Sequence, residues 1–436
     1  MPTPSSRLSS TELQRLASAE LDDTVKGVPL GVVTSLDRVA EHGWNVAAGD
    51  LPLPVTTLCA DALESNVQTM ARYCERVGAS FAPHGKTTMS PQLFDRQLAA
   101  GAWGLTCATP TQAAVMRRFG AQRILMANPL VEASGWRWVV AEVRRDPELE
   151  FLSLVDSVEG VRRVDELLGA HPPASPLPVL LEVGVEHGRS GVRTIADGVA
   201  VAEAVASSEH LRLVGVEAYE GLVATDATER DLDNLDIFFT RIRQTLLRVV
   251  GSGLLHTDEI IVTAGGSDFF DRVVAHLSTW EELDRPVRLV LRSGCYISHD
   301  SGRYHRLSPL DGRALDSEPL RLENALTAWA AVLSTPEPGL AILGAGKRDL
   351  AHDISLPAPR TLHRSDGTTL DLRGRAEVFR LMDQHAFLRF DPGVEITAGD
   401  VVALDSDHPC SAFDKSPFMP LIDRDNNVVD AIRTFF

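Results

Sequence analysis

Short apolar runs alternate with longer amphipathic stretches along the chain as far as about residue 300. Eight of these runs have the length of a β-strand: Ser80–His84, Gly104–Ala108, Arg123–Ala127, Glu150–Val155, Pro178–Val183, Arg212–Ala218, Glu259–Thr263 and Val287–Leu291. The connections between them are long enough for helices, and helical periodicity is clearest in Thr111–Phe119, Val158–Leu168, Ile195–Ala206 and Leu232–Val250. This alternation favours a parallel sheet, and eight units favour a (β/α)8 barrel of the TIM type. The alternative, an open doubly wound sheet, usually has a glycine-rich dinucleotide turn after its first strand, which this sequence lacks.

The pattern changes from about Arg303 onwards. Helical periodicity gives way to β-like runs punctuated by proline and glycine: Thr327–Leu333, Leu340–Leu343, Ala386–Phe390 and Val401–Leu404. Asp423–Asn427 separates two apolar pairs, which is typical of a hairpin. We therefore expect an N-terminal helical extension over 1–50 with a helix at Ser10–Leu21, a barrel domain over 51–302, and a separate β domain over 303–436.

Charge and cysteine content exclude several classes of protein. The formal net charge is −18, from 60 acidic and 42 basic residues, and such a surface repels nucleic acid and anionic membranes. The five cysteines are odd in number and widely scattered, which fits a reducing compartment rather than a disulfide framework. We find neither a signal-peptide pattern nor an apolar run of about 18 residues. The composition therefore predicts a cytoplasmic protein with no nucleic-acid or membrane partner.

Lys86 is the first candidate for chemistry. It lies in Ala82-Pro83-His84-Gly85-Lys86-Thr87, just after the first predicted strand, and in a barrel the functional residues gather at the strand ends. A lysine whose amine is deprotonated forms Schiff bases with aldehydes. Gly-Lys-Thr also ends the P-loop motif, but that motif needs a glycine where this chain has Ser80. An ordinary exposed loop lysine is the remaining alternative.

A phosphate-binding turn is the second candidate. Gly265, Gly266 and Ser267 follow the seventh predicted strand, and barrel phosphate sites favour the loops after strands seven and eight. Glycines let backbone N–H groups approach a phosphate closely. A glycine pair at such a turn can also be purely conformational.

Four other side chains lie close to predicted strand ends or to Lys86. Arg189 would bind an anionic group of a cofactor or substrate, or it is a surface arginine. Tyr219 and Tyr296 follow the sixth and eighth strands, where they would contact a cofactor or substrate. His84 would adjust the pKa of the Lys86 amine or relay protons, or it is structural.

His408 and Cys410 form a candidate metal pair near the C-terminus. Imidazole nitrogen and thiolate sulfur are typical zinc ligands, and residues at i and i+2 of an extended strand point to the same face. A thiolate favours zinc over magnesium, calcium or manganese. Two protein ligands leave coordination positions open for water and substrate.

The segments around Lys86 and His408 resemble the fold-type III pyridoxal-phosphate enzymes of the D-serine dehydratase and D-threonine aldolase family, bacterial amino acid deaminase type. The likeness extends from about Pro54 to Phe436. It implies an alanine racemase-like barrel followed by a β domain, pyridoxal 5'-phosphate on Lys86, a phosphate turn at Gly265-Gly266-Ser267, and a homodimer. The chain departs from the family at Ala82, where many members have arginine, so the role of that arginine is vacant or filled elsewhere.

The resemblance implies dehydration of a 3-hydroxy D-amino acid, such as D-serine to pyruvate and ammonia. Lys86 would remove the Cα proton, and zinc on His408 and Cys410 would bind the substrate hydroxyl. Cys410 favours the dehydratase because the aldolase branch commonly has aspartate there. The alternatives are a metal-dependent aldolase acting on D-threonine or 3-hydroxy-D-aspartate, and, in another class, a non-catalytic pyridoxal-phosphate-binding protein. A racemase usually needs a tyrosine from the C-terminal domain, and none follows Tyr304.

Overall fold

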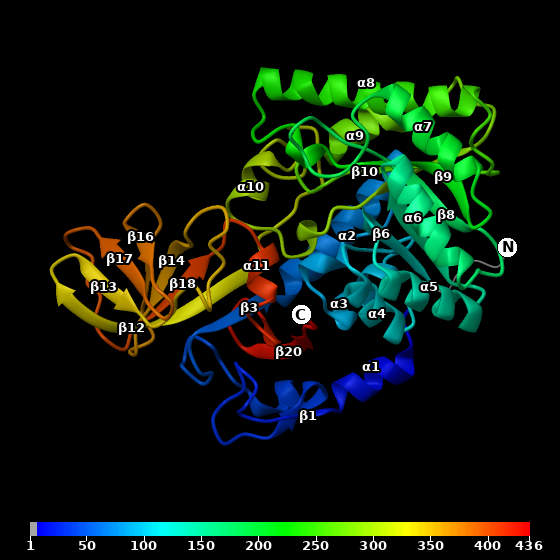
Figure 1. The fold of residues 1–436 in the computed structure, drawn as a ribbon. Coiled ribbons are helices and arrows are strands. Elements are labelled where there is room, and N and C mark those ends of the chain that lie inside the picture. The colour runs from blue at the N-terminus through cyan, green and yellow to red at the C-terminus, as the bar shows by residue number, and fades with distance from the viewer. Residues whose placement is uncertain (1–6) are drawn as a thin grey trace. The chain divides into compact units, whose positions relative to one another are not determined.

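A parallel eight-stranded sheet is the core of the first of two units in the computed structural model, which describes residues 7–436 (Figure 1). This unit consists mainly of Ala71–Lys86 and Gln97–Gly294. Its strands run in the spatial order β4-β11-β10-β9-β8-β7-β6-β5. Their bounds are β4 Ser80–Phe81, β5 Leu105–Cys107, β6 Arg123–Pro129, β7 Glu150–Val155, β8 Leu177–Val183, β9 Leu211–Ala218, β10 Ile260–Ala264 and β11 Val287–Leu291.

Backbone hydrogen bonds join the segments of β4 and β5, which stand at the two ends of this spatial order, and so close the sheet into a barrel. The N–H of Trp103 donates to the carbonyl of Phe81 at 2.6 Å, and the N–H of Thr106 donates to the carbonyl of Pro83 at 2.9 Å. Apolar side chains of the strands form a core cluster that contains Leu125, Leu152, Leu154, Leu180 and Val214. All eight predicted strands are present, and the prediction of a (β/α)8 barrel is confirmed.

The helices that follow the strands are α4 Pro110–Arg118, α5 Ala133–Arg145, α6 Val158–Gly169, α7 Ile195–Ala206, α8 Glu229–Gly251 and α9 Phe270–Leu277, with α2 Ala60–Val77 and α3 Pro91–Ala99 earlier in the chain. Four of them start after a serine or threonine whose side chain accepts a backbone N–H of the first turn: Thr109, Ser157, Thr194 and Thr228. Such caps satisfy N–H groups that have no partner within the helix. The local sequence therefore determines where these helices begin.

The second unit, Ser9–Met70, Thr87–Arg96 and Cys295–Phe436, is built on mainly antiparallel strands. One path runs β15-β14-β18-β12-β13-β17-β16, and β3 and the β19–β20 hairpin join it through β12. The bounds are β3 Val55–Cys59, β12 Leu326–Glu337, β13 Leu340–Leu343, β14 Ala358–His363, β15 Thr369–Asp371, β16 Ala376–Leu381, β17 Ala386–Phe390, β18 Val401–Asp405, β19 Phe418–Ile422 and β20 Val428–Arg433. The predicted C-terminal β structure, including its hairpin, is confirmed.

Two local predictions are corrected by the structure. The first helix, α1 Ser10–Ala17, ends before Leu21, because Glu20–Leu21 forms strand β1, which pairs with β2 (Thr34–Ser35). His408 and Cys410 do not lie on an extended strand: Pro409 has α-helical angles, and Cys410 begins the short helix α11, Cys410–Phe413. In addition, β3 comes from the part of the chain assigned above to the barrel domain, yet it pairs with β12 and β19.

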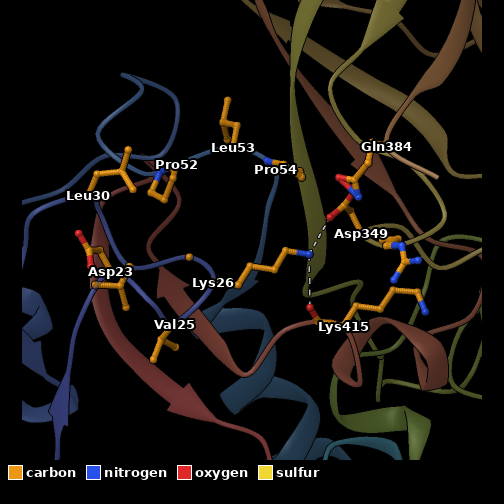
Figure 2. Close-up of a pocket in the computed structure, with 13 residues that line it drawn as sticks. Asp23, Val25, Lys26, Leu30, Pro52, Leu53, Pro54, Asp349, Gln384 and Lys415 are labelled. Carbon is orange, nitrogen blue, oxygen red and sulfur yellow. Dashed lines mark hydrogen bonds and ion pairs between the residues drawn. The ribbon is translucent and has the colours of Figure 1, made fainter. Parts of the chain in front are cut away.

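A pocket of the second unit has a cavity of about 500 Å³ between the N-terminal segment and the β domain. Lys26 lines it, and its Nζ donates to Asp349 Oδ1 at 2.7 Å and to the carbonyl of Lys415 at 3.4 Å (Figure 2). These bonds join the segment around Lys26 to two distant parts of the same unit.

Within residues 7–436, every helix is too short or too polar to cross a membrane.

Candidate active site

Lys86 lies in a short 3-10 helix, Gly85–Thr87, directly after β4. The preceding residues are held in place by backbone hydrogen bonds: the N–H of Ala82 donates to Leu291 at 2.8 Å, and the N–H of His84 donates to Arg292 at 3.1 Å. Ala82 is fully buried, and Lys86 is half-buried. The lysine therefore emerges at the C-terminal end of a barrel strand, where the sequence predicted it.

His84 is the polar side chain closest in sequence to Lys86. Its Nδ1 is buried and has no hydrogen-bond partner within the described protein. Burial lowers the pKa of His84 well below its ordinary value, and the positive charges of Lys86 and Arg292 lower it further. The imidazole is therefore neutral at physiological pH and has a ring nitrogen available to a bound group.

Two buried carboxyl groups face each other at the ends of β8 and β9, where Glu182 and Glu217 are paired in register. Glu217 Oε1 lies 2.5 Å from Nη2 of Arg292, whose guanidinium also donates to Thr263 Oγ1 at 3.1 Å. Ser190 Oγ donates to Glu182 Oε1 at 2.9 Å, while Oε2 of both glutamates is buried and has no hydrogen-bond partner among residues 7–436. Burial, and then the charge of Glu217, raise the pKa of Glu182 to about 7. Burial raises the pKa of Glu217 as well, and the charges of Arg292 and Arg189 oppose this rise, so the two carboxyl groups titrate as an interacting pair.

This raised pKa predicts a pH-dependent contribution of Glu182 to stability. A carboxyl whose pKa is higher in the folded protein than in the unfolded chain stabilises the fold at low pH and loses that contribution as pH rises. The free energy of unfolding of wild type, relative to Glu182→Gln, should fall by about 1–3 kcal/mol as pH rises from about 4.5 to about 7. Urea unfolding of both proteins at several pH values measures this difference. A difference that stays constant over the range would contradict the assignment.

Arg189 and Tyr219, two of the predicted site residues, lie together. The guanidinium Cζ of Arg189 is 4.6 Å from the centroid of the Tyr219 ring, which is a cation–π distance. The positive charge of Arg189 lowers the pKa values of Glu182, Glu217 and His84. The barrel thus brings His84, Lys86, Arg189 and Tyr219 to one end of the sheet.

The predicted phosphate turn follows β10, the seventh strand. Gly265 has a φ of +102°, a conformation that favours glycine. The N–H groups of Gly265 and Gly266 both donate to the carboxylate of Glu220, at 3.1 and 2.6 Å. Ser267 is buried beside them, and Ser293 Oγ donates to the carbonyl of Gly266 at 2.6 Å. The turn therefore has two convergent N–H donors and already binds an anionic group.

The second unit holds a group of three metal-ligand side chains. The potential ligand atoms of Cys295, His408 and Cys410 all lie within 4.8 Å of one another, and the two sulfurs are 3.3 Å apart. His408 Nδ1 is 2.5 Å from Asp353 Oδ2, and Asp353 Oδ1 accepts a hydrogen bond from Ser411 at 2.6 Å. A carboxylate on one ring nitrogen leaves the other as the candidate ligand atom, so Nε2 is the His408 atom available to a metal.

Cys295 was not among the residues predicted to bind metal. It begins the short 3-10 helix Cys295–Ile297, and 115 residues separate it from Cys410. Tyr296, the next residue, is 2 % exposed. Burial raises the pKa of the Cys295 thiol well above its ordinary value, and the neighbouring Cys410 raises it further. A metal ion would compensate for the charge of a thiolate there, so this donor set suits a soft cation.

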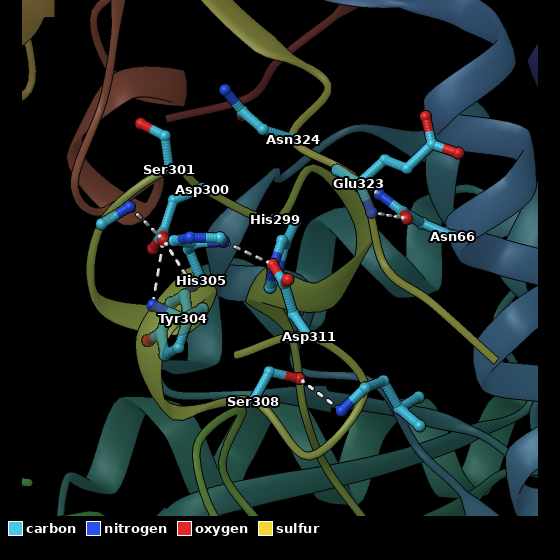
Figure 3. A network of polar contacts seen from close by, with 12 residues as sticks. Asn66, His299, Asp300, Ser301, Tyr304, His305, Ser308, Asp311, Glu323 and Asn324 are labelled. Carbon is cyan, nitrogen blue, oxygen red and sulfur yellow. Dashed lines mark hydrogen bonds and ion pairs between the residues drawn. The ribbon is translucent and has the colours of Figure 1, made fainter. Parts of the chain in front are cut away.

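A polar network fixes the segment that follows Cys295 (Figure 3). Asp300 Oδ1 accepts the backbone N–H groups of Gly302 and Tyr304, each at 2.9 Å. Asp311 Oδ2 lies 2.8 Å from His299 Nε2 and 2.9 Å from His305 Nδ1. These contacts, all within the second unit, hold the backbone that carries Cys295 and Tyr296.

The residues at the barrel end fit pyridoxal phosphate, and those of the second unit fit a metal. Lys86 supplies an amine, the Gly265-Gly266 turn supplies anion-binding N–H groups, and the partnerless His84 Nδ1 supplies a hydrogen-bonding atom. Sequence reasoning did not include Glu217, Glu220 or Arg292 in the site. Their signal was a charged residue at the end of a largely apolar strand or within two residues after it, a region that in barrels is often functional.

Comparisons with known proteins agree with this arrangement. Residues 58–256 match the alanine racemase N-terminal domain, and residues 325–422 match a serine dehydratase domain. D-Threonine aldolase of Arthrobacter sp. is 25% identical over 361 residues, which cover 83% of this chain and 86% of that protein. 3-Hydroxy-D-aspartate aldolase of Paracoccus denitrificans (strain Pd 1222) is 26% identical over 326 residues, 73% of this chain and 79% of that protein.

Solved structures show the same fold. D-Threonine aldolase from Filomicrobium marinum superposes with a TM-score of 0.73 at 24% identity, covering 90% of this chain and 97% of that one. D-threo-3-hydroxyaspartate dehydratase from Delftia sp. HT23 superposes with a TM-score of 0.69 at 19% identity, covering 89% and 98%. The alanine racemase-like barrel, the C-terminal match to a serine dehydratase domain and these relatives together support a fold-type III pyridoxal-phosphate enzyme of the D-threonine aldolase and D-serine dehydratase family.

Proposed function

We propose that this protein is a pyridoxal-phosphate- and metal-dependent lyase that cleaves 3-hydroxy D-amino acids between Cα and Cβ, giving glycine and an aldehyde. The Cys295–His408–Cys410 group carries the proposal, because a metal ion held there would act as a Lewis acid on a hydroxyl oxygen of the substrate. The relatives that match most of the chain are aldolases, which favours cleavage over the dehydration that Cys410 suggested. We take zinc to be the metal, because two thiols and an imidazole are its usual ligands.

Thr87, a residue of the second unit, contacts two members of the candidate metal group. Thr87 Oγ1 lies 3.7 Å from the sulfurs of both Cys295 and Cys410. Thr87 is the residue after Lys86, and consecutive Cα atoms are only about 3.8 Å apart. One peptide bond therefore joins the candidate cofactor lysine to a residue that contacts the metal group.

The residues of this chain have distinct tasks in the proposed reaction. Lys86 would hold the cofactor and, once the substrate amine has replaced it, serve as an acid or base near Cα. Bound pyridoxal phosphate supplies a ring that accepts the electron pair released when a bond to Cα breaks. Cys295, His408 and Cys410 would hold the metal, which supplies Lewis-acid polarisation of a hydroxyl oxygen. Cleavage removes the hydroxyl proton, turns the Cβ–OH into a carbonyl, and returns a proton to Cα of the product glycine.

Dehydration is the second candidate, and a specific observation favours it. The metal group contains two sulfur atoms, and a thiolate-bound zinc suits the departure of hydroxide without a base on the hydroxyl proton. Residues 325–422 also match a serine dehydratase domain. The product would then be a 2-oxo acid with ammonia.

D-Threonine distinguishes the two reactions in one assay. We expect glycine and acetaldehyde in equal amounts from the protein loaded with pyridoxal phosphate and zinc, with L-threonine turned over at least about tenfold more slowly, since Lys86 can address one face of the bound substrate. The measurement is product analysis by chromatography, with Lys86→Ala as the inactive control. 2-Oxobutyrate and ammonia would establish the dehydratase instead. If neither glycine with an aldehyde nor a 2-oxo acid with ammonia forms from D-threonine, D-serine or 3-hydroxy-D-aspartate, the lyase proposal is rejected.

A further inference from the structure

Glu220 is a buried carboxylate placed on the candidate phosphate turn. It begins the short 3-10 helix Glu220–Leu222 after β9 and is fully buried. Oε2 accepts the N–H of Gly265 at 3.1 Å, and Oε1 accepts the N–H of Gly266 at 2.6 Å. A carboxylate that accepts two adjacent backbone N–H groups makes the kind of contact that a phosphate makes at a glycine-rich turn.

The surroundings show that this contact is built into the fold. A Cβ at Gly221 would lie 2.4 Å from the Tyr219 hydroxyl oxygen, so the Tyr219 ring packs against position 221 where a larger residue would displace it. A Cβ at Gly266 would lie 3.1 Å from the Tyr219 ring and 3.3 Å from Glu220 Oε1. Gly265 needs its positive φ to present its N–H group on the same side. Three glycines thus leave room for the carboxylate, the two N–H donors and the Tyr219 ring to lie together.

The polar contacts of Glu220 in the described residues are with backbone N–H groups rather than with a directly paired cation. In the described part of the chain, no lysine, arginine or histidine forms an ion pair with it, whereas Arg292 is paired with Glu217. Burial raises the pKa of Glu220, whereas the hydrogen bonds from the two glycine N–H groups and the positive charge of Arg292 lower it. An incoming phosphate monoester would need the same donors, and it would bring a second negative charge to within a few ångströms of the first.

We propose that the Glu220 carboxyl group competes with the phosphate group of the cofactor for the two N–H groups of the Gly265-Gly266 turn. Glu220 is then an internal competitor that weakens phosphate binding and eases exchange of the cofactor. The inference rests on the proposed pyridoxal-phosphate dependence. That dependence does not itself require any role for Glu220.

Two ligands that differ only in the phosphate group test this competition. Full-length wild type, Glu220→Gln and Glu220→Ala, each freed of cofactor, are titrated with pyridoxal phosphate and with pyridoxal, and binding is followed by absorbance. We expect both variants to bind pyridoxal phosphate about tenfold more tightly than wild type does, because a charge repulsion is removed, and to bind pyridoxal with unchanged affinity. Glu259→Gln, a carboxylate at the other end of the barrel strand, is the control and should change neither affinity.

The outcomes separate competition from a merely structural role. If Glu220 only shaped the turn, its removal would weaken pyridoxal phosphate binding or change both affinities equally, and either result overturns the proposal. The near-isosteric Gln variant keeps the test available if the Ala variant does not fold. If wild type binds neither ligand, the cofactor assignment fails, and inorganic phosphate then decides the role of Glu220. A larger rise in melting temperature with phosphate for Glu220→Gln than for wild type supports it, and an equal rise refutes it.

Discussion

Replacing Lys86 with alanine should lower turnover of the proposed substrates by at least about a thousandfold, because in the proposed reaction Lys86 both holds the cofactor and moves protons at Cα. The variant should also lose the visible absorbance of lysine-bound cofactor. In wild type, borohydride should link the cofactor permanently to one peptide, the one that contains Lys86. The chain has only four lysines, Lys26, Lys86, Lys347 and Lys415, so mass spectrometry of the reduced protein gives an unambiguous answer.

Lys347→Ala is the matched control for this experiment, because Lys347 is an exposed lysine of the second unit. It should retain the absorbance, the labelled peptide and full turnover. Borohydride labelling at any lysine other than Lys86 would show that the cofactor is attached elsewhere.

Replacing a residue of the candidate metal group should have the second large effect, a loss of both metal affinity and activity. His408→Ala and Cys410→Ala should bind metal with an affinity lowered by about a hundredfold or more and lose activity to a similar extent, while the cofactor absorbance persists. Cys295→Ala should also lose metal affinity, because its sulfur lies 3.3 Å from that of Cys410. Metal content after dialysis, measured by elemental analysis, and turnover with added zinc are the readouts.

Two further measurements isolate the part played by Cys295. Cobalt bound in place of zinc gives thiolate absorption bands, and these should be weaker in Cys295→Ser than in wild type, since one sulfur ligand is missing. Cys59→Ala, a change of a free cysteine outside the metal group, should leave metal content unchanged. Full metal content in His408→Ala, or unaltered cobalt bands in Cys295→Ser, would show that the ion is held by other residues.

The alternation of strands and helices could be predicted because it depends on local patterns. Burial on both faces makes the barrel strands continuous apolar runs, and amphipathic helices repeat every 3.6 residues. Each predicted barrel strand has its counterpart among β4 to β11, within a few residues at its ends. Predictions failed where short-range preference was ambiguous: the chain leaves the first helix after Ala17, and Pro409 takes helical angles where an extended strand was expected.

The sequence by itself determined the fold class, the lysine at the end of the first barrel strand and the His-x-Cys pair, since each is carried by neighbouring residues. Only the tertiary structure decided which distant groups meet. Strand β3 pairs with β12, Cys295 approaches Cys410 across 115 residues, and Glu220 reaches the N–H groups of Gly265 and Gly266 across 45 and 46 residues. Hydrophobic periodicity predicts which face of a helix or strand is buried, but it does not predict which other element packs against that face. The third candidate metal ligand and the carboxylate on the candidate phosphate turn therefore become visible only in the folded chain.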